Sequence, residues 1–133
     1  MYTYKTSVRM HQTDAAGVIF FAELFTLAHD CYETFLSQEV TIKEIVNDKP
    51  FIIPIVHASA DYKQPLGLSE NITINMTCVN CGTSSFTLNC QILKENGSVA
   101  AEVKTVHAIV NKESRTAAQI PFEINDLLLE ISV

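Results

Sequence analysis

The chain has 133 residues, of which 47% are hydrophobic and 18% charged, a composition typical of one globular domain. Its net charge of −6 at pH 7 argues against broad nucleic-acid binding, which needs a basic surface, but allows one phosphorylated ligand. No apolar run approaches the roughly 20 residues of a membrane-spanning helix, and the N-terminus lacks the apolar segment of a secretory signal. We therefore expect a single cytoplasmic domain over residues 1–133 that binds no membrane.

A strand and a long helix are the first predicted elements. Residues 2–8 are expected to form the strand. Over residues 21–36 apolar side chains recur at steps of three and four, which predicts a helix with one wide apolar face. These apolar positions are Phe21, Leu24, Phe25, Ala28, Cys31, Tyr32, Phe35 and Leu36. A short second helix is expected over residues 41–47, ahead of Lys49-Pro50.

Strand patterns follow over residues 52–62, 71–80, 85–94 and 98–111. The first is rich in β-branched residues, the next two alternate apolar with polar residues, and Glu95-Asn96-Gly97 predicts a tight turn before the last. In the last strand the apolar phase shifts, from Val99, Ala101 and Val103 to Val106, Ala108 and Val110. This shift predicts a bulge, or a strand covered on both faces. Pro121 is expected to start a short closing helix.

These elements predict an α+β fold built on an antiparallel sheet of about five strands. Because the long helix is apolar on one side only, it is expected to lie across one face of the sheet. The other face is expected to be polar, or covered by a second subunit.

Four cysteines raise the question of a metal or redox site. Cys78 and Cys81 match C-x-x-C, but zinc needs a second Cys or His pair, and a thioredoxin-like motif opens a helix. Cys78 and Cys90 fall in phase with core positions. The thiols are therefore expected to be structural, and no metal site is predicted.

The long helix is predicted to begin without a side-chain cap. Its neighbours Val18, Ile19 and Phe20 cannot cap it, and Asp14 lies too far back. The segment Asp14-Ala15-Ala16-Gly17 fits a type I turn, which by itself is only a structural feature. Uncapped helix N–H groups also suit an anion or a polarised carbonyl oxygen. If these N–H groups face a carboxylate, the two together can catalyse acyl transfer. The amides stabilise the oxyanion, and the carboxylate either attacks the carbonyl carbon or takes a proton from a water that attacks it.

The segment HQTDAAGVIFF, residues 11–21, resembles the signature of hotdog-fold acyl-CoA thioesterases of the 4-hydroxybenzoyl-CoA thioesterase family. The strand order is also similar, so the resemblance covers nearly the whole chain. It implies the hotdog fold, in which the sheet wraps around one long central helix. Within the family, TDAAGV and residues 29–33 and 54–62 are most similar to 1,4-dihydroxy-2-naphthoyl-CoA hydrolases, enzymes of phylloquinone and menaquinone synthesis.

The resemblance implies three roles in the first loop. Asp14 falls on the family's catalytic carboxylate, either as nucleophile or as general base. Phe21 falls on the position whose backbone N–H holds the thioester carbonyl oxygen, so only its main chain is needed. Gly17 lets the backbone approach the ligand closely.

Further substrate contacts are expected elsewhere. The acyl group is expected to lie against Val18, Phe20 and His57, although a strand histidine can equally be structural. Tyr62 and Lys63 end a strand and are expected to reach a neighbouring subunit's site, with Lys63 either a phosphate contact or simply solvated. Many relatives carry Gly-Asp where this chain has residues 68–71, LSEN, which leaves the coenzyme A contacts of that loop open.

The sequence therefore predicts an acyl-CoA thioesterase that forms a homodimer or homotetramer with its sites at the interface. Coenzyme A is part of the substrate, and no separate cofactor is expected. The best substrate is predicted to be 1,4-dihydroxy-2-naphthoyl-CoA, with a broad-range aryl- or fatty acyl-CoA thioesterase as one alternative. The others are a hydroxyacyl-thioester dehydratase, whose histidine only His57 or His11 could supply, and a non-catalytic acyl-CoA binding protein.

Overall fold

One antiparallel sheet and one long helix organise the chain in the computed structural model, which describes residues 1–133. The strands are β1 Tyr2–Ser7, β2 Phe51–Ile52, β3 Ile55–Tyr62, β4 Asn71–Cys81, β5 Ser85–Lys94, β6 Val99–Ala108 and β7 Val110–Asn111. The helices are the 3₁₀ helix η1 Met10–Gln12, then α1 Glu23–Leu36, α2 Ile42–Asn47 and α3 Phe122–Glu130. Five strands form the sheet in the order β1-β4-β5-β6-β3, each antiparallel to its neighbour.

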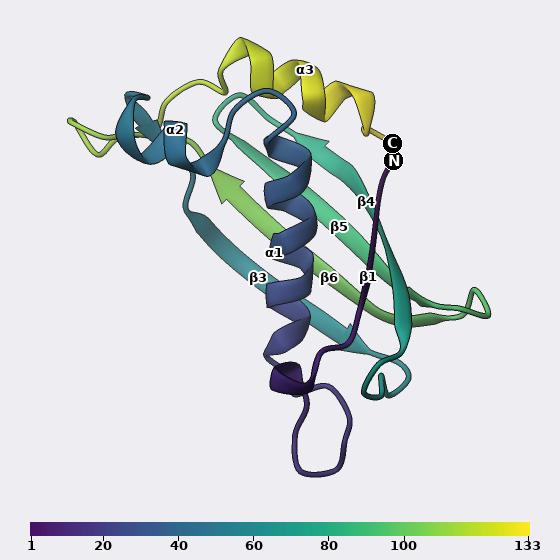
Figure 1. Ribbon diagram of the computed structural model, residues 1–133. Helices are drawn as coiled ribbons and strands as arrows, with labels where there is room; N and C mark the ends of the chain where they lie inside the picture. Colours follow the sequence, from purple (N-terminus) through teal and green to yellow (C-terminus); the bar gives the residue numbers. More distant parts are fainter.

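Helix α1 lies across one face of the sheet (Figure 1), as its one-sided apolar pattern predicts. Its buried side chains belong to one hydrophobic core of 29 residues that also draws on the inner faces of the strands. The opposite face of the sheet is polar: Thr3 bonds Asn75, and Gln91 bonds Glu102. Polar side chains thus occur on this face, as the first of the two expectations states, and its covering by a second subunit stays a prediction.

Helix α1 begins at Glu23, two residues later than the sequence pattern indicates. Phe21 and Ala22 form a turn, closed by the Glu23 N–H, which donates to the Phe20 carbonyl at 2.9 Å. As a result Phe21, expected on the apolar face, is 61% exposed, whereas Leu27 is buried. The absence of a side-chain cap is confirmed, because the N-cap residue is Ala22.

Two predicted strands are each divided in the structure. Ile53 and Pro54 interrupt the first, since proline cannot donate to a strand ladder, and β2 pairs with β7 while β3 pairs with β6. The last strand splits into β6 and β7 without the expected change of phase. Val103, His107 and Ile109 are buried in one continuous alternation, and the shift was inferred because His107 is polar. A register irregularity lies instead near Ala100, between the pairs Ile92–Ala101 and Leu93–Val99.

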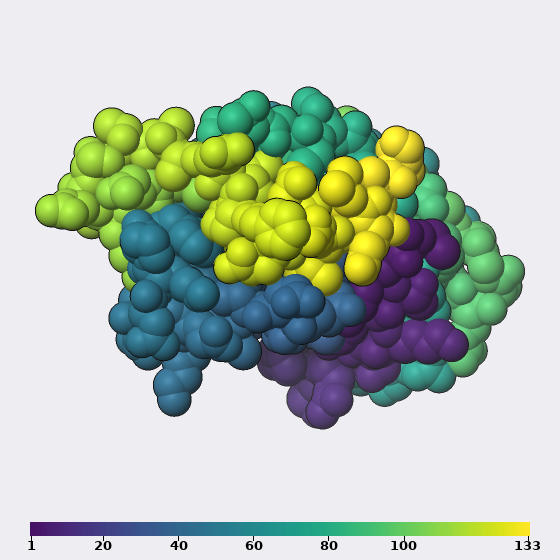
Figure 2. All heavy atoms as spheres, turned by 90° about the horizontal axis from the view of Figure 1, so that it is seen from above, coloured from purple at the N-terminus to yellow at the C-terminus, as the bar shows by residue number.

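Helix α3 closes one end of the molecule. Viewed from that end, it fills the surface between the α2 region and the N-terminal strand (Figure 2). Ile124, Leu127 and Leu128 are its buried side chains. No helix in the chain has both the length and the apolar character needed to cross a membrane.

The cysteines occupy positions expected of structural thiols. All four are free, and Cys31, Cys78 and Cys90 are buried. Burial raises the pKa of the Cys78 thiol to about 11, chiefly by desolvation and then through neighbouring Cys81. Such a thiol stays protonated at neutral pH and is a poor nucleophile.

Candidate active site

The loop before α1 is a small hairpin that carries Asp14 at its tip. Thr13 and Ile19 form an antiparallel bridge, and Asp14 N–H donates to the Val18 carbonyl at 2.9 Å. Inside it the Gly17 N–H donates to the Asp14 carbonyl at 3.0 Å, which closes the predicted turn. Gly17 has φ +78°, a left-handed conformation that favours glycine. A Cβ there would meet nothing within 4 Å, so backbone conformation is the structural reason for glycine here.

The carboxylate of Asp14 is exposed, and only one of its two oxygens accepts a hydrogen bond from the chain. Its Oδ1 accepts a hydrogen bond from the Ala16 N–H at 2.8 Å, an Asx turn that orients the side chain. Its Oδ2 accepts no hydrogen bond from the chain. One carboxylate oxygen is therefore positioned and the other is available to a ligand or a water.

The backbone at the start of α1 offers unpaired donors. The N–H groups of Phe21 and Ala22 donate to no acceptor within the chain. The residue before them is anchored, since Phe20 N–H donates to the Gln12 carbonyl at 2.8 Å. The Phe20 and Phe21 rings lie 4.7 Å apart and are both exposed, giving the donors an apolar surround. The dipole of α1 adds positive potential at this end.

Tyr62 and Lys63 meet this region from the end of β3. The Tyr62 hydroxyl donates to the Phe21 carbonyl, and desolvation raises the pKa of Tyr62 above its ordinary value. Tyr62, Lys63 and Val18 line a shallow hollow of about 260 Å³. Lys63 Nζ lies 3.8 Å from Glu102 Oε2, so its charge is partly compensated. The structure thus brings together Asp14's loop, Phe21, Val18, Tyr62 and Lys63.

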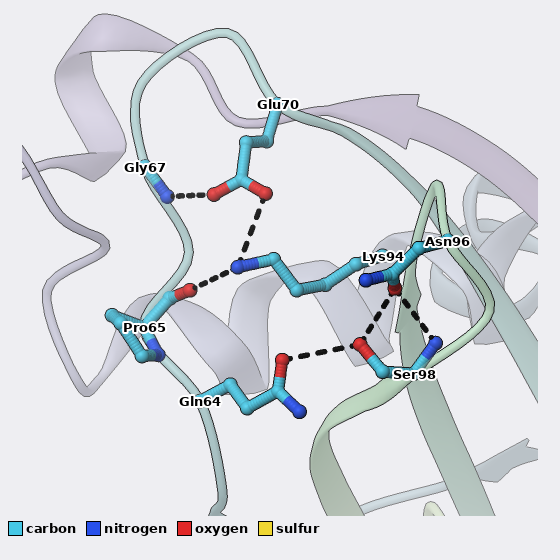
Figure 3. Close-up of polar contacts among 7 residues, drawn as sticks. All are labelled: Gln64, Pro65, Gly67, Glu70, Lys94, Asn96 and Ser98. Carbon is cyan, nitrogen blue, oxygen red and sulfur yellow. Dashed lines mark hydrogen bonds and ion pairs between the residues drawn. The ribbon is translucent and has the colours of Figure 1, made fainter.

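A second loop, residues 64–70, supports the hairpin. Ile19 N–H donates to the Leu66 carbonyl at 2.7 Å, and Leu68 N–H donates to the Gly17 carbonyl at 3.1 Å. Glu70 accepts from the Gly67 N–H and pairs with Lys94 at 3.3 Å (Figure 3). These contacts, the Gly67 N–H first, hold the pKa of Glu70 below its ordinary value.

Lys94 and Ser98 fasten the same loop to the turn between β5 and β6. Lys94 Nζ donates to the Pro65 carbonyl at 2.9 Å, and Ser98 Oγ donates to Gln64 Oε1 at 3.1 Å (Figure 3). Residues 68–71, where the chain departs from the thioesterase pattern, therefore have a structural role in bracing the Asp14 hairpin.

His57 does not join this group within one chain. It pairs with Val106, whereas Tyr62 pairs with Ala101, which is buried beneath α1. Alternation along β3 puts Ala58, Ala60 and Tyr62 on the face toward α1 and His57 on the opposite face. A contact between His57 and an acyl group held near Phe20 would need a second subunit.

A buried His107 is the feature that sequence reasoning passed over. Its ring stacks on Phe86 at 4.9 Å, and its centroid lies 4.4 Å from that of Tyr32. Burial, and secondarily the nearby His29, lowers the pKa of His107 to about 4. The only sequence signal was a polar residue at an in-phase core position. No cluster of three His, Cys, Asp or Glu side chains could hold a metal ion.

Comparison with known proteins connects this geometry to one family. A family model described as the thioesterase-like superfamily matches residues 8–128, which include the Asp14 hairpin and α1. A 1,4-dihydroxy-2-naphthoyl-CoA hydrolase from Gloeothece citriformis is 35% identical over 124 residues, 91% of this chain and 87% of that protein.

Solved structures agree with the sequence comparison. A 1,4-dihydroxy-2-naphthoyl-CoA thioesterase from Synechocystis superposes with a TM-score of 0.92 at 26% identity, over 98% of this chain and 96% of that one. A gentisyl-coenzyme A thioesterase superposes with a TM-score of 0.82 at 25% identity, over 92% of this chain and 98% of that one. The similarity to these thioesterases and the strand order confirm the predicted α+β hotdog fold.

Proposed function

Because this chain belongs to the thioesterase-like superfamily, we propose that it hydrolyses an acyl-CoA thioester to the free acid and coenzyme A. The observation that carries the proposal is the unpaired Phe21 N–H at the start of α1, next to the hairpin that presents Asp14. The hairpin supplies a carboxylate and the helix start supplies a donor for a developing oxyanion. Hydrolysis of a thioester needs these two groups and a water.

In the proposed reaction the thioester carbonyl oxygen accepts a hydrogen bond from the Phe21 N–H. The carbonyl carbon is attacked either by Asp14 itself, giving an anhydride that water then cleaves, or by a water that Asp14 deprotonates. The C–S bond breaks, and coenzyme A leaves as the thiolate or thiol. Glu70 and Lys94 act only as positioning residues, through the loop that supports the hairpin.

The proposed substrate is 1,4-dihydroxy-2-naphthoyl-CoA, an intermediate of phylloquinone and menaquinone synthesis. Support comes from the hydrolase of Gloeothece citriformis and the thioesterase of Synechocystis, whose names specify this ester. The gentisyl-coenzyme A thioesterase, whose acyl group is also a hydroxylated aromatic ring, supports an aryl ester more broadly. A wider aryl- or fatty acyl-CoA range is the second candidate.

We also propose that two copies pair through β3 to form a homodimer, or a tetramer of such dimers. β3 is an edge strand, and its Ile55 and Val56 are 41% and 61% exposed. Long apolar edge strands are usually covered. Pairing would bring a second subunit toward His57, Tyr62 and Lys63, the residues assigned to acyl and phosphate contacts. No membrane or nucleic-acid partner is proposed, and the proposed location is the cytoplasm.

The test is a panel of esters assayed by thiol release. It contains 1,4-dihydroxy-2-naphthoyl-CoA, 4-hydroxybenzoyl-CoA, and short and long fatty acyl-CoAs, each with the wild type and Asp14→Asn. A strong preference for the naphthoyl ester that is lost in the variant supports both the reaction and the substrate. A flat profile that still depends on Asp14 keeps the reaction and removes the substrate assignment.

The other function classes make different predictions. A dehydratase needs a histidine paired with a carboxylate, and no histidine in the chain lies within ion-pair distance of one. If His57→Ala removed activity while Asp14→Ala stayed active, a dehydratase would be favoured. A non-catalytic binding protein would bind acyl-CoA without releasing thiol, and Asp14→Asn would change nothing.

A further inference from the structure

A small cavity lies between α1, the edge strand β3 and β6. Its volume is about 80 Å³, and its walls include Phe25, Tyr32, Ile55, Ala58, Thr105 and His107. Phe25 belongs to the first turn of α1, the same end of the helix at which the unpaired Phe21 N–H lies. The cavity therefore has a wall residue at the end of α1 where the proposed function holds the thioester carbonyl oxygen.

Two residues that line the cavity each carry a buried polar atom with no hydrogen-bond partner. These atoms are the Tyr32 hydroxyl and Nδ1 of His107. Tyr32 is 4% exposed and His107 is 1% exposed, so bulk water does not satisfy either atom. Buried polar groups in native proteins are nearly always paired, and an exception calls for an explanation. Here two exceptions occur side by side, on rings whose centroids are 4.4 Å apart.

The hydrogen bond between Thr105 and His107 limits which ligand group could pair with the Tyr32 hydroxyl and His107 Nδ1. Thr105 Oγ1 lies 2.8 Å from His107 Nε2, so that ring nitrogen is already occupied. A phenolic hydroxyl both donates and accepts hydrogen bonds, as does the Tyr32 hydroxyl. It can therefore bond both Nδ1 and Tyr32, whichever ring nitrogen of His107 carries the proton. An aliphatic chain in the same place would leave both atoms unpaired.

The shape of the cavity points to a ring as well. Its wall residues Tyr32 and His107 belong to a cluster of three rings with Phe86, in which His107 and Phe86 are nearly parallel at 4° and Tyr32 is tilted by 40° to His107. A space of about 80 Å³ admits one edge of an aromatic ring and blocks a long chain. Apart from Tyr32, His107, Thr105 and His29, its walls are apolar, formed by Phe25, Ala28, Ile55 and Ala58.

We propose that this cavity receives the hydroxyl-bearing edge of an aromatic acyl group, and that Tyr32 and His107 recognise the hydroxyl remote from the thioester. The inference rests on the proposed function, which supplies the carbonyl position at Phe21. It adds to that function the residues that distinguish a hydroxylated ring from an unsubstituted ring or an aliphatic chain. A site built to bond a hydroxyl rejects an analogue that lacks it, because its own polar groups then stay unpaired.

The experiment compares two esters that differ in one hydroxyl, 1,4-dihydroxy-2-naphthoyl-CoA and 1-hydroxy-2-naphthoyl-CoA. The measured quantity is the ratio of their kcat/KM values. We expect the wild type to favour the 4-hydroxyl ester by about tenfold or more, and Tyr32→Phe to bring the ratio to within about threefold of one. Tyr4→Phe is the matched control, a partly buried tyrosine on β1 that packs against the core far from the cavity, and it should keep the wild-type ratio.

Thermal melting separates recognition from a structural role. Tyr32→Phe removes a buried unpaired hydroxyl, so the Tm of the ligand-free protein should stay the same or rise. If Tyr32 served only packing or stability, the variant would lower Tm and slow both esters equally. That result, or a wild-type ratio near one, would overturn the inference while leaving the proposed function intact.

Failure of the proposed function would look different, since the wild type would then hydrolyse neither ester. Calorimetric binding of the free acids, 1,4-dihydroxy-2-naphthoate and 1-hydroxy-2-naphthoate, still decides the inference in that case. Weaker binding of the dihydroxy acid to Tyr32→Phe than to wild type supports it. Equal binding, or no binding to the wild type, overturns it.

Discussion

The start and the middle of α1 both leave polar atoms unpaired, but under opposite conditions. At the start, the N–H groups of Phe21 and Ala22 lie beside an exposed ring, where water can bond them. In the middle, the Tyr32 hydroxyl and His107 Nδ1 are shut away from water. A buried unpaired group costs about 1–3 kcal/mol, whereas a hydrated one costs little. The exposed N–H groups proposed for the reaction therefore lower the free energy of unfolding very little. The buried polar atoms assigned to recognition lower it more.

Removing the donor at the start of α1 should have the largest effect. Phe21→Pro eliminates the N–H proposed to hold the oxyanion, and we expect kcat to fall by about 100- to 1,000-fold. Ala22→Pro removes the adjacent unpaired N–H at a residue whose φ of −69° suits proline, so it should cost much less. Circular dichroism should show both variants folded. An equal loss in the two would mean that the Phe21 N–H has no special part.

The buried end should respond to pH. The folded-state pKa of His107 is lowered to about 4 from an ordinary 6.5. As pH falls from about 6.5 to about 4, the unfolded chain binds a proton at His107 that the folded chain does not bind. The free energy of unfolding therefore falls with decreasing pH. The expected decline is roughly a few kcal/mol. Urea unfolding at pH 7 and pH 4.5 measures it, and His107→Asn should flatten the slope between them; an unchanged slope would contradict the account.

A matched pair of glycines tests whether the hairpin geometry matters for activity. Gly17 and Gly97 both have positive φ, +78° and +85°, and neither has an atom within 4 Å of an added Cβ. Substitution by alanine should therefore cost about 1–2 kcal/mol of stability at either position. Only Gly17→Ala should also reduce kcat, because it disturbs the Asp14 turn. Equal kcat values in the two variants would contradict this prediction, because the Asp14 turn would then have no influence on catalysis.

The smallest effect is expected from the brace behind the hairpin. Glu70→Gln weakens its contacts with Gly67 and Lys94, so we expect activity to fall severalfold at pH 7 with little change in KM. Because the pKa of Glu70 is lowered in the folded state, the stability it contributes is present above pH 4.5 and is lost as pH falls further. The Tm difference between wild type and variant should therefore shrink below pH 4. A constant difference would mean that the charge is not what braces the loop.

Much of the fold could be predicted because it follows from local patterns. The alternation in β4 and β5 and the three- and four-residue spacing in α1 each specify a buried face. The apolar phase of the last strand was wrongly predicted to shift, since a buried His107 looks like a break in it. Helix α1 was placed two residues early because apolar Phe21 continues its pattern, although it lies in a turn.

The site was predictable only in part. Asp14, Gly17 and Phe21 lie in one contiguous segment, so a sequence motif identifies them together. The Tyr32–His107 contact joins residues 75 positions apart in the chain and depends on how α1 packs on β6. The support that loop 64–70 gives the hairpin likewise arises from backbone hydrogen bonds that no side-chain pattern records.

The most direct test of the central claim is the initial rate of thiol release from 1,4-dihydroxy-2-naphthoyl-CoA by wild type, Asp14→Asn and Asp126→Asn. Asp126 is an exposed carboxylate on α3, far along the chain from the hairpin. We predict rapid release by the wild type and by Asp126→Asn, and a loss of at least about 100-fold in Asp14→Asn. Equal rates in all three proteins would contradict the account, because the hairpin would then present a carboxylate that takes no part in the reaction.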